Sequence, residues 1–213
     1  MIYMTNEEKY QNAIEHLTEL IKIFPYDGTY YFARGDVYYK LEKYKDAIAD
    51  YTKAISFTFN CDREYFWRGM AYEHLDEYVA IDDFSKAIEI NPNYEVAYYK
   101  RGGIYEKLKK YDDAIDNYTK MIEKFPNNYM AYFSRGRYYM MLEKYEKGIA
   151  DFTKSIKLNP NYDFAYFWRG NAYRILKKYN LAITDYTKAI KINTNYIDAY
   201  KAREETNKKI EHD

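Results

Sequence analysis

The sequence predicts an all-α protein built as an array of helix pairs, and three observations lead to this fold class. The dipeptide Arg-Gly recurs at spacings of 34, 33, 34 and 34 residues, beginning at Arg34 and ending at Arg169. Between these dipeptides, apolar residues recur three and four positions apart, which is the periodicity of a helix and not of a strand. The few prolines fall at one place in the period. A fixed period of this length indicates a repeat array.

The first element, residues 1–27, matches the second helix of a unit whose first helix is missing. Thr5 and Glu8 have the spacing of a capping box that would start this helix, and Pro25 follows its end. The element is either a natural cap or the cut edge of a longer protein. Five full units are predicted next, over residues 28–61, 62–94, 95–128, 129–162 and 163–196. The last helix, residues 197–213, has a polar outer face and is expected to cap the array.

Each full unit divides into two helices at a charged turn, as at Lys177-Lys178. Breakers such as Asn159-Pro160-Asn161 separate one unit from the next. Twenty of the 30 tyrosines fall in four recurring slots of the unit, which predicts that they pack helix against helix. The aromatic composition is therefore interpreted as core and not as a cofactor site.

The pattern Tyr-x2-Arg-Gly-x2-Tyr, followed by Ala-x3-Tyr or Phe-x2-Ala and then Pro, resembles the tetratricopeptide repeat, a helix-turn-helix unit. The resemblance covers nearly the whole chain and implies a right-handed α-α superhelix of antiparallel helix pairs. Departures are modest: Phe59 and Thr194 replace the terminal proline, Gly148 and Ser155 replace alanines, and the second unit is one residue short near Tyr78.

Numbered within each unit, the recurring arginine is position 7 and the glycine is position 8. The family packing implies that the two helices of a unit approach most closely at the glycine. The arginine needs a partner, since an unpaired buried cation is very costly. Position 23 offers Asp50, Asp83, Asn117, Asp151 and Asp185. We expect arginine and aspartate to pair between adjacent helices, and Arg203, which has no second helix of its own, to use Asp185.

Composition and charge exclude several classes of function. Lysine plus arginine equals aspartate plus glutamate, at 33 each, so no overall field draws the protein to nucleic acid or an anionic membrane. A single cysteine, Cys61, cannot form an internal disulfide, and no stretch has the length of a membrane span. These features predict a soluble, cytoplasmic protein.

Catalysis has little support in the sequence. The three histidines, His16, His74 and His212, have no ligand spacing, and there is no nucleophile elbow or phosphate loop. We therefore expect no enzyme activity, no catalytic or metal-binding residues and no cofactor.

In this family the first helix of each unit lines a concave groove, mainly at positions 2, 5, 6, 9, 12 and 13, so the resemblance implies a peptide-binding site. The groove residues that the resemblance predicts in this chain are Phe32, Asp36, Arg63, Phe66, Trp67, Tyr99, Lys100, Phe133, Arg137, Phe167, Trp168, Asn171 and Arg174. They are aromatic, with more cations than anions. The expected partner is a protein or peptide with apolar anchors and some acidic character.

The sequence disfavours the carboxylate clamp and leaves two alternatives to peptide binding in the groove. The carboxylate clamp by which some family members bind chaperone tails needs Lys at position 5 with Asn at 9, then Asn at 6, then Lys at 2 with Arg at 6, and no three units satisfy it. The main alternative is a self-assembling module that forms homo-oligomers through its terminal helices. Single-stranded RNA binding through stacked aromatics and arginine is a third possibility, which the neutral net charge disfavours.

Overall fold

The computed structural model describes residues 5–212, and for residues 211 and 212 it describes the backbone alone. The described chain is all-α, as predicted, with no strand among these residues. Its helices are α1 (Asn6–Ile23), α2 (Gly28–Lys40), α3 (Tyr44–Phe57), α4 (Asp62–Tyr72), α5 (Glu77–Ile90), α6 (Glu95–Lys107), α7 (Tyr111–Lys124), α8 (Tyr129–Met141), α9 (Tyr145–Leu158), α10 (Asp163–Ile175), α11 (Tyr179–Ile192) and α12 (Ile197–His212).

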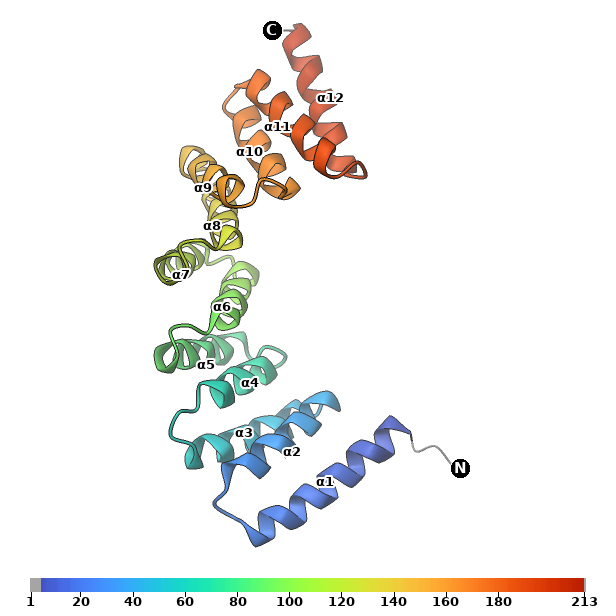
Figure 1. Ribbon diagram of the computed structural model, residues 1–213, viewed down its shortest axis with the longest axis vertical. Coiled ribbons are helices and arrows are strands. Elements are labelled where there is room, and N and C mark those ends of the chain that lie inside the picture. Colours follow the sequence, from blue (N-terminus) through green and yellow to red (C-terminus); the bar gives the residue numbers. More distant parts are fainter. Residues whose placement is uncertain (1–4, 213) are drawn as a thin grey trace. The chain divides into compact units, whose positions relative to one another are not determined.

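The chain forms two compact units, Met1–Ile104 and Tyr105–Asp213, each built from helix pairs that pack on their neighbours. In the first unit α2 packs with α3 and α4 with α5, while α1 contacts α2 and α3 contacts α4. In the second unit α8 pairs with α9 and α10 with α11, and α12 packs on α11. Figure 1 shows these consecutive helices joined by short connections. Antiparallel helix pairs stacked in chain order are the arrangement of a solenoid.

The first helix begins where the sequence predicts. The Thr5 hydroxyl accepts a hydrogen bond from the Glu8 backbone N–H at 3.2 Å, and the Thr5 N–H donates to Glu8 Oε2 at 2.7 Å. This reciprocal capping box satisfies two backbone groups that the helix itself leaves unpaired. The predicted capping box is confirmed.

The glycine at position 8 makes room for an aromatic ring at position 24. A Cβ at Gly136 would lie 2.8 Å from Cε1 of Phe152, and a Cβ at Gly170 would lie 2.7 Å from Cε1 of Tyr186. Phe152 and Tyr186 are fully buried. The close approach at this glycine is confirmed, and the group that would clash is a ring of the facing helix.

Not every tyrosine slot lies in the core. Tyr51 and Tyr186, at position 24, are fully buried, whereas Tyr78 is 58% exposed and Tyr200 is 41% exposed. Tyrosines at position 24 therefore belong to the hydrophobic core, whereas some tyrosines at the other recurring positions are exposed.

Within the described residues, the turns inside four of the five helix pairs place a charged residue in a left-handed conformation. Glu42, Lys109, Glu143 and Lys177 have φ between 55° and 57°. The second predicted repeat is one residue short at this turn and has no such residue. There the Asp76 carboxylate caps α5 instead, accepting hydrogen bonds from the N–H groups of Tyr78 and Val79. The missing residue is thus compensated by an N-cap.

We expect Glu143→Gly to raise the free energy of unfolding by about 0.5–1 kcal/mol, because glycine adopts positive φ without the steric cost paid by glutamate. Urea denaturation followed by circular dichroism measures the change. The control is Leu75→Gly in the short turn of the second repeat, where no residue has positive φ. That substitution should lower stability, since it adds freedom to the unfolded chain and removes an apolar side chain that is 49% exposed. A loss of stability in Glu143→Gly would contradict this account.

Candidate binding surface

The first helices of the units are fixed in place by paired arginines. The position-7 guanidinium donates Nε–H and Nη2–H bonds of 2.7–2.8 Å to both carboxylate oxygens of the position-23 aspartate. The pairs are Arg34 with Asp50, Arg68 with Asp83, Arg135 with Asp151 and Arg169 with Asp185. The predicted pairing is confirmed at these four places. The hydrogen bond to Asp50 raises the pKa of Arg34, so the guanidinium stays charged.

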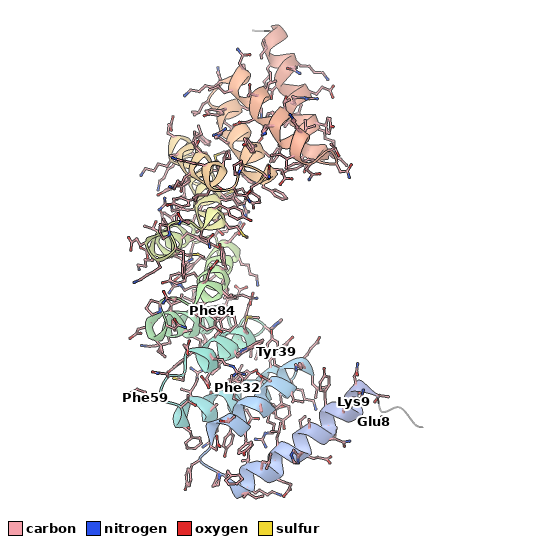
Figure 2. The ribbon with its side chains drawn as sticks, in the orientation of Figure 1. Glu8, Lys9, Phe32, Tyr39, Phe59 and Phe84 are labelled. Atoms are coloured by element: carbon pink, nitrogen blue, oxygen red, sulfur yellow. The ribbon has the colours of Figure 1, made fainter. Side chains whose placement is uncertain are left out.

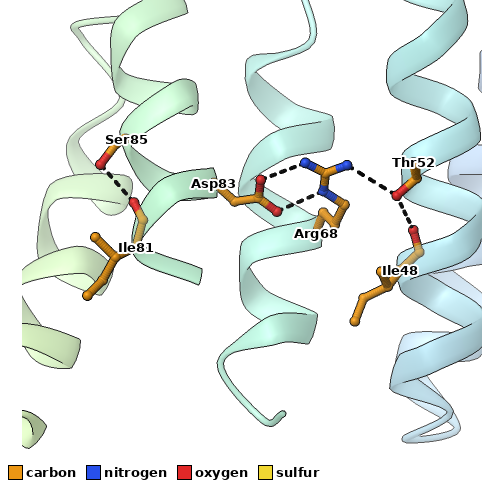
Figure 3. A network of polar contacts seen from close by, with 6 residues as sticks. All are labelled: Ile48, Thr52, Arg68, Ile81, Asp83 and Ser85. Carbon is orange, nitrogen blue, oxygen red and sulfur yellow. Dashed lines mark hydrogen bonds and ion pairs between the residues drawn. The ribbon is translucent and has the colours of Figure 1, made fainter. Parts of the chain in front are cut away.

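The same guanidinium also reaches back to the preceding repeat. Nη1 of Arg68 donates to the Thr52 hydroxyl at 3.1 Å, and that hydroxyl donates to the carbonyl oxygen of Ile48 at 2.7 Å (Figure 3). The equivalent bonds run from Arg34 to Thr18, from Arg101 to Ser85, from Arg135 to Thr119, from Arg169 to Thr153 and, at 3.4 Å, from Arg203 to Thr187. Each arginine therefore joins its own helix to the second helix of the preceding repeat.

The prediction that Arg203 pairs with Asp185 is wrong. Both oxygens of Asp185 are taken by Arg169, and among the described residues Arg203 contacts only the Thr187 hydroxyl and the ring of Tyr200. The geometry of the repeat explains the difference. The guanidinium at position 7 reaches the carboxylate at position 23 of its own repeat and the hydroxyl at position 25 of the preceding repeat. Arg203 therefore meets Thr187 and not Asp185. Glu204 fills the glycine slot of α12 and pairs with Lys208 at 2.8 Å. A second helix that docked here would meet the Glu204 side chain.

The first helices present one surface in each compact unit, which we call the first-helix surface: α2, α4 and residues 95–104 of α6 in the first unit, and α8, α10 and α12 in the second. Most position-5 aromatics lie beneath it. Phe32, Phe66 and Phe133 are 5%, 6% and 9% exposed. Figure 2 shows Phe32 lying between the helices. These side chains support the surface from below and offer a ligand little area.

The rings of the next loop cover the position-5 aromatics. The ring centroids of Tyr94 and Phe66 are 4.8 Å apart, and those of Tyr162 and Phe133 are 4.9 Å apart. Phe167 is half-buried in the same way against Tyr196. Position 5 therefore belongs to the packing between repeats.

In the first unit, each charged residue predicted for the groove has a partner of opposite charge. Arg63 lies 4.0 Å above the ring of Phe32 and 3.8 Å from the carboxylate of Asp36. Asp36 accepts a hydrogen bond from the Tyr51 hydroxyl, while burial raises the pKa of its carboxyl. Lys100, next to the half-buried Tyr99, contacts Glu73 at 3.2 Å. The cations are thus largely compensated.

Trp67 is wedged among aromatic neighbours of the first unit. Its ring meets Tyr39 edge-on at 5.5 Å and Phe66 edge-on at 5.8 Å. The Tyr44 and His74 rings stack nearby at 4.1 Å. Trp67 is half-buried, so much of its ring contributes to packing.

The second unit holds a small aromatic pocket on its first-helix surface. Its volume is about 330 Å³, and it is lined by Phe133, Arg137, Tyr162, Phe164 and Trp168. The Arg137 guanidinium lies 5.4 Å from the Trp168 ring centroid, within cation–π range. Burial raises the pKa of Tyr162 to about 12, so its hydroxyl brings no negative charge. The pocket combines aromatic walls with one cation.

Arg137 is held by a carboxylate at the rim of this pocket. Its Nη2 donates to Glu106 Oε1 at 2.8 Å, and the Tyr138 hydroxyl donates to Glu106 Oε2 at 3.0 Å. Both Arg137 and Glu106 keep part of their side chains exposed. A ligand carboxylate would therefore have to compete with Glu106.

The remaining predicted residues lie near the end of the second unit. Asn171 accepts a hydrogen bond of 2.8 Å from the Tyr186 hydroxyl. Arg174 lies 3.9 Å from Glu205, and its Nε is buried without a hydrogen-bond partner among the described residues. These two side chains extend the polar part of the surface from α10 towards α12.

The described residues contain no group of three or more His, Cys, Asp or Glu side chains arranged to hold a metal ion. None of the described helices combines the length and the apolar character needed to cross a bilayer.

The repeating geometry matches a known sequence family. Sequence profiles described as "Tetratricopeptide repeat" match residues 28–60 and residues 96–128, 129–162 and 164–196. These segments make up more than half of the chain. The protein belongs to the tetratricopeptide repeat family, whose members are typically non-catalytic scaffolds for protein interactions.

Solved structures give the same fold. YrrB, described as a TPR protein with an unusual peptide-binding site, is similar with a TM-score of 0.73 and 21% identity, covering 90% of this chain and 99% of its own. MamA from Desulfovibrio magneticus is similar with a TM-score of 0.67 and 21% identity, and the match covers 79% of this chain and 96% of MamA. The first TPR domain of Spaghetti (RPAP3), bound to an HSP90 peptide, has a TM-score of 0.53 and 29% identity. That match covers 55% of this chain and 92% of the RPAP3 domain. No curated protein matches the sequence.

Proposed function

We propose that this protein is a non-catalytic scaffold that binds a peptide or an extended segment of a partner protein on its first-helix surface. The observation that carries the proposal is the aromatic pocket of the second unit, lined by Phe133, Arg137, Tyr162, Phe164 and Trp168. Its volume suits one large apolar side chain, and ligand pockets typically combine apolar walls with few polar groups. Peptide complexes among similar folds, such as the RPAP3 domain with an HSP90 peptide, add support.

The pocket favours an apolar anchor residue with an acidic residue beside it. Trp168 and Phe164 would contact the anchor, because both keep part of their rings exposed. Arg137 would face the acidic residue. Since Glu106 already neutralises Arg137, most of the affinity should come from the apolar anchor and little from charge.

Selection from a random peptide library on the immobilised protein tests this proposal. The selected peptides should share a large apolar residue. Fluorescence anisotropy then measures their affinity for the wild type and for Trp168→Ala, which should bind at least about tenfold more weakly, or by about 1.4 kcal/mol. Leu181→Ala is the matched control, because Leu181 is an exposed apolar residue on the second helix of the same repeat. Equal affinity for wild type and Trp168→Ala would refute the proposed surface.

We expect the acidic HSP90 peptide SRMEEVD to bind more weakly than about 1 mM, a free energy smaller in size than about 4 kcal/mol. The reason is that aromatic residues occupy position 5, where the carboxylate clamp requires lysine, and Phe32, Phe66 and Phe133 are buried there. The RPAP3 domain serves as the positive control in the same anisotropy assay. Saturable binding of the peptide at micromolar concentrations would mean that another set of cations can replace the clamp.

A further inference from the structure

Two loops of the first compact unit expose aromatic side chains beside one another. The α1–α2 loop and the α3–α4 loop line a cleft of about 690 Å³ that includes Phe24, Tyr26, Phe57 and Phe59. Tyr26 is 80% exposed and Phe59 is 97% exposed. Figure 2 shows Phe59 at the loop between α3 and α4, pointing away from the helices. None of the predicted groove residues lines this cleft.

Three of the four later loops at the same place in the repeat are closed by asparagine. At the helix ends Asn91, Asn159 and Asn193, the side-chain oxygen accepts a hydrogen bond of 3.1 Å from the backbone N–H two residues on. Asn91 and Asn193 also donate to Asp62 and Asp163, at 2.8 Å and 2.9 Å. The first two loops have Phe24 and Thr58 at this capping position, and the α7–α8 loop has Phe125. The first two loops therefore lack the polar closure of the three asparagine loops.

The Tyr26 and Phe59 rings are mostly exposed and do not take the inward-facing place that a tyrosine has in other loops. In three of the four later loops the last residue is Tyr94, Tyr162 or Tyr196, whose ring packs inward on a position-5 aromatic. Asp27 and Cys61 take that position in the first two loops. Their aromatic residues stand one or two positions earlier and face outward. A contiguous exposed apolar surface of this kind marks an interaction site.

Ring contacts hold the walls of the cleft in place. Tyr26 meets Phe57 edge-on at 5.8 Å with an interplanar angle of 85°, and Tyr31 packs on Phe57 at 5.8 Å. The Tyr31 hydroxyl donates to the carbonyl oxygen of Pro25 at 3.1 Å. A Cβ at Gly28 would lie 2.9 Å from Thr58 Oγ1, so glycine lets the two loops come together. The wall formed by Tyr26, Tyr31 and Phe57 is thus preorganised, which lowers the cost of binding.

The charge of the cleft is negative. Asp27 is the one ionisable side chain other than tyrosine among the described residues that line it. Its Oδ1 caps α2 by accepting a hydrogen bond from the Thr29 N–H at 2.9 Å, and the residue is exposed. A positively charged group on an apolar ligand would complement it.

We propose that this cleft binds a proline-rich segment of a partner protein that carries an arginine or lysine next to its prolines. Proline-rich segments are extended before binding, and their rings pack on exposed aromatic rings. Proline has no N–H group that would lose its hydrogen bond to water in an apolar cleft. The basic residue pairs with Asp27. This second surface is independent of the pocket around Trp168.

The test measures anisotropy of a fluorescent synthetic peptide of consecutive prolines ending in one arginine. The key variant is Tyr26→Asn with Phe59→Pro, which places in these loops the residues that later loops have as Asn93 and Pro92. Thr58 has φ −108° and ψ 132°, a conformation that a following proline accepts. We expect saturable binding to the wild type and at least tenfold weaker binding to the double variant, with an unchanged thermal unfolding midpoint.

Two further variants sharpen the result. Asp27→Asn keeps the helix cap and removes the charge, so it should weaken the arginine peptide but not a peptide with glutamine in its place. Trp168→Ala should bind the proline peptide with the affinity of the wild type. This holds whether or not Trp168→Ala weakens the binding of library-selected peptides, because the cleft and the pocket share no lining residue.

Three results would overturn the proposal. The first is no saturable binding of the peptide, or equal binding to the double variant. The second is self-association in light scattering without peptide that the double variant abolishes, which would assign the cleft to a second copy. The third is binding to phosphatidylserine vesicles that the double variant abolishes, which would assign it to a lipid surface.

Discussion

Asp151→Ala is expected to lower the free energy of unfolding by about 2–3 kcal/mol, because it leaves the Arg135 guanidinium without its carboxylate. The arginine side chain is 17% exposed and the aspartate 8%, so water replaces little of the lost contact. Thr119 still accepts one hydrogen bond from Nη1. Urea denaturation gives the overall change. Hydrogen exchange of α8 and α9 locates it, since repeat arrays can unfold in parts.

The control is the double variant Arg135→Met with Asp151→Leu. It removes both charges and keeps apolar volume, so it should cost much less than Asp151→Ala alone. If both variants lose the same free energy, the effect comes from packing and not from an unpaired cation. If Asp151→Ala loses less than about 0.5 kcal/mol, the pair behaves like an exposed ion pair and does not fix the first helices.

Gly170→Ala and Gly103→Ala are expected to change stability in opposite directions. A Cβ at Gly170 would lie 2.7 Å from the fully buried Tyr186 ring, so alanine should cost about 1–2 kcal/mol after its higher helix propensity is counted. A Cβ at Gly103, in α6, meets nothing within 4 Å. Alanine there should stabilise the protein by about 1 kcal/mol.

Thermal and urea unfolding of the two variants measure this difference. Because both substitutions add the same methyl group to a helical glycine, the comparison isolates the contact with Tyr186. Stabilisation by Gly170→Ala would contradict the role given to the glycine at position 8.

The fold could be predicted because one period repeats along the chain. The Arg-Gly spacing sets the register, and the facing Asp at position 23 follows from the need to pair a buried cation. The threonine or serine at position 25 was equally visible in the sequence, from Thr18 to Thr187. It was missed because a hydroxyl on a helix usually bonds its own backbone, so its contact with the next repeat needs the three-dimensional stacking.

The binding surface could be predicted only in part. Composition cannot tell a ring that faces a ligand from one that the next loop covers, and Tyr162 covers Phe133 in this way. Likewise, a count of cations along the first helices does not show that Arg137 pairs with Glu106. Both contacts join different repeats, and the sequence of a single repeat carries no sign of them.

We propose that partners bind on the first-helix surface around Trp168, and the two tryptophans of the chain allow a direct measurement. A ¹⁵N–¹H NMR spectrum contains one indole N–H signal from Trp67 and one from Trp168, assigned by single substitutions. Titration with a library-selected peptide should shift the Trp168 signal progressively to saturation, at the same affinity that anisotropy gives. If the peptide saturates the protein while the Trp168 signal stays fixed, the surface assignment is contradicted.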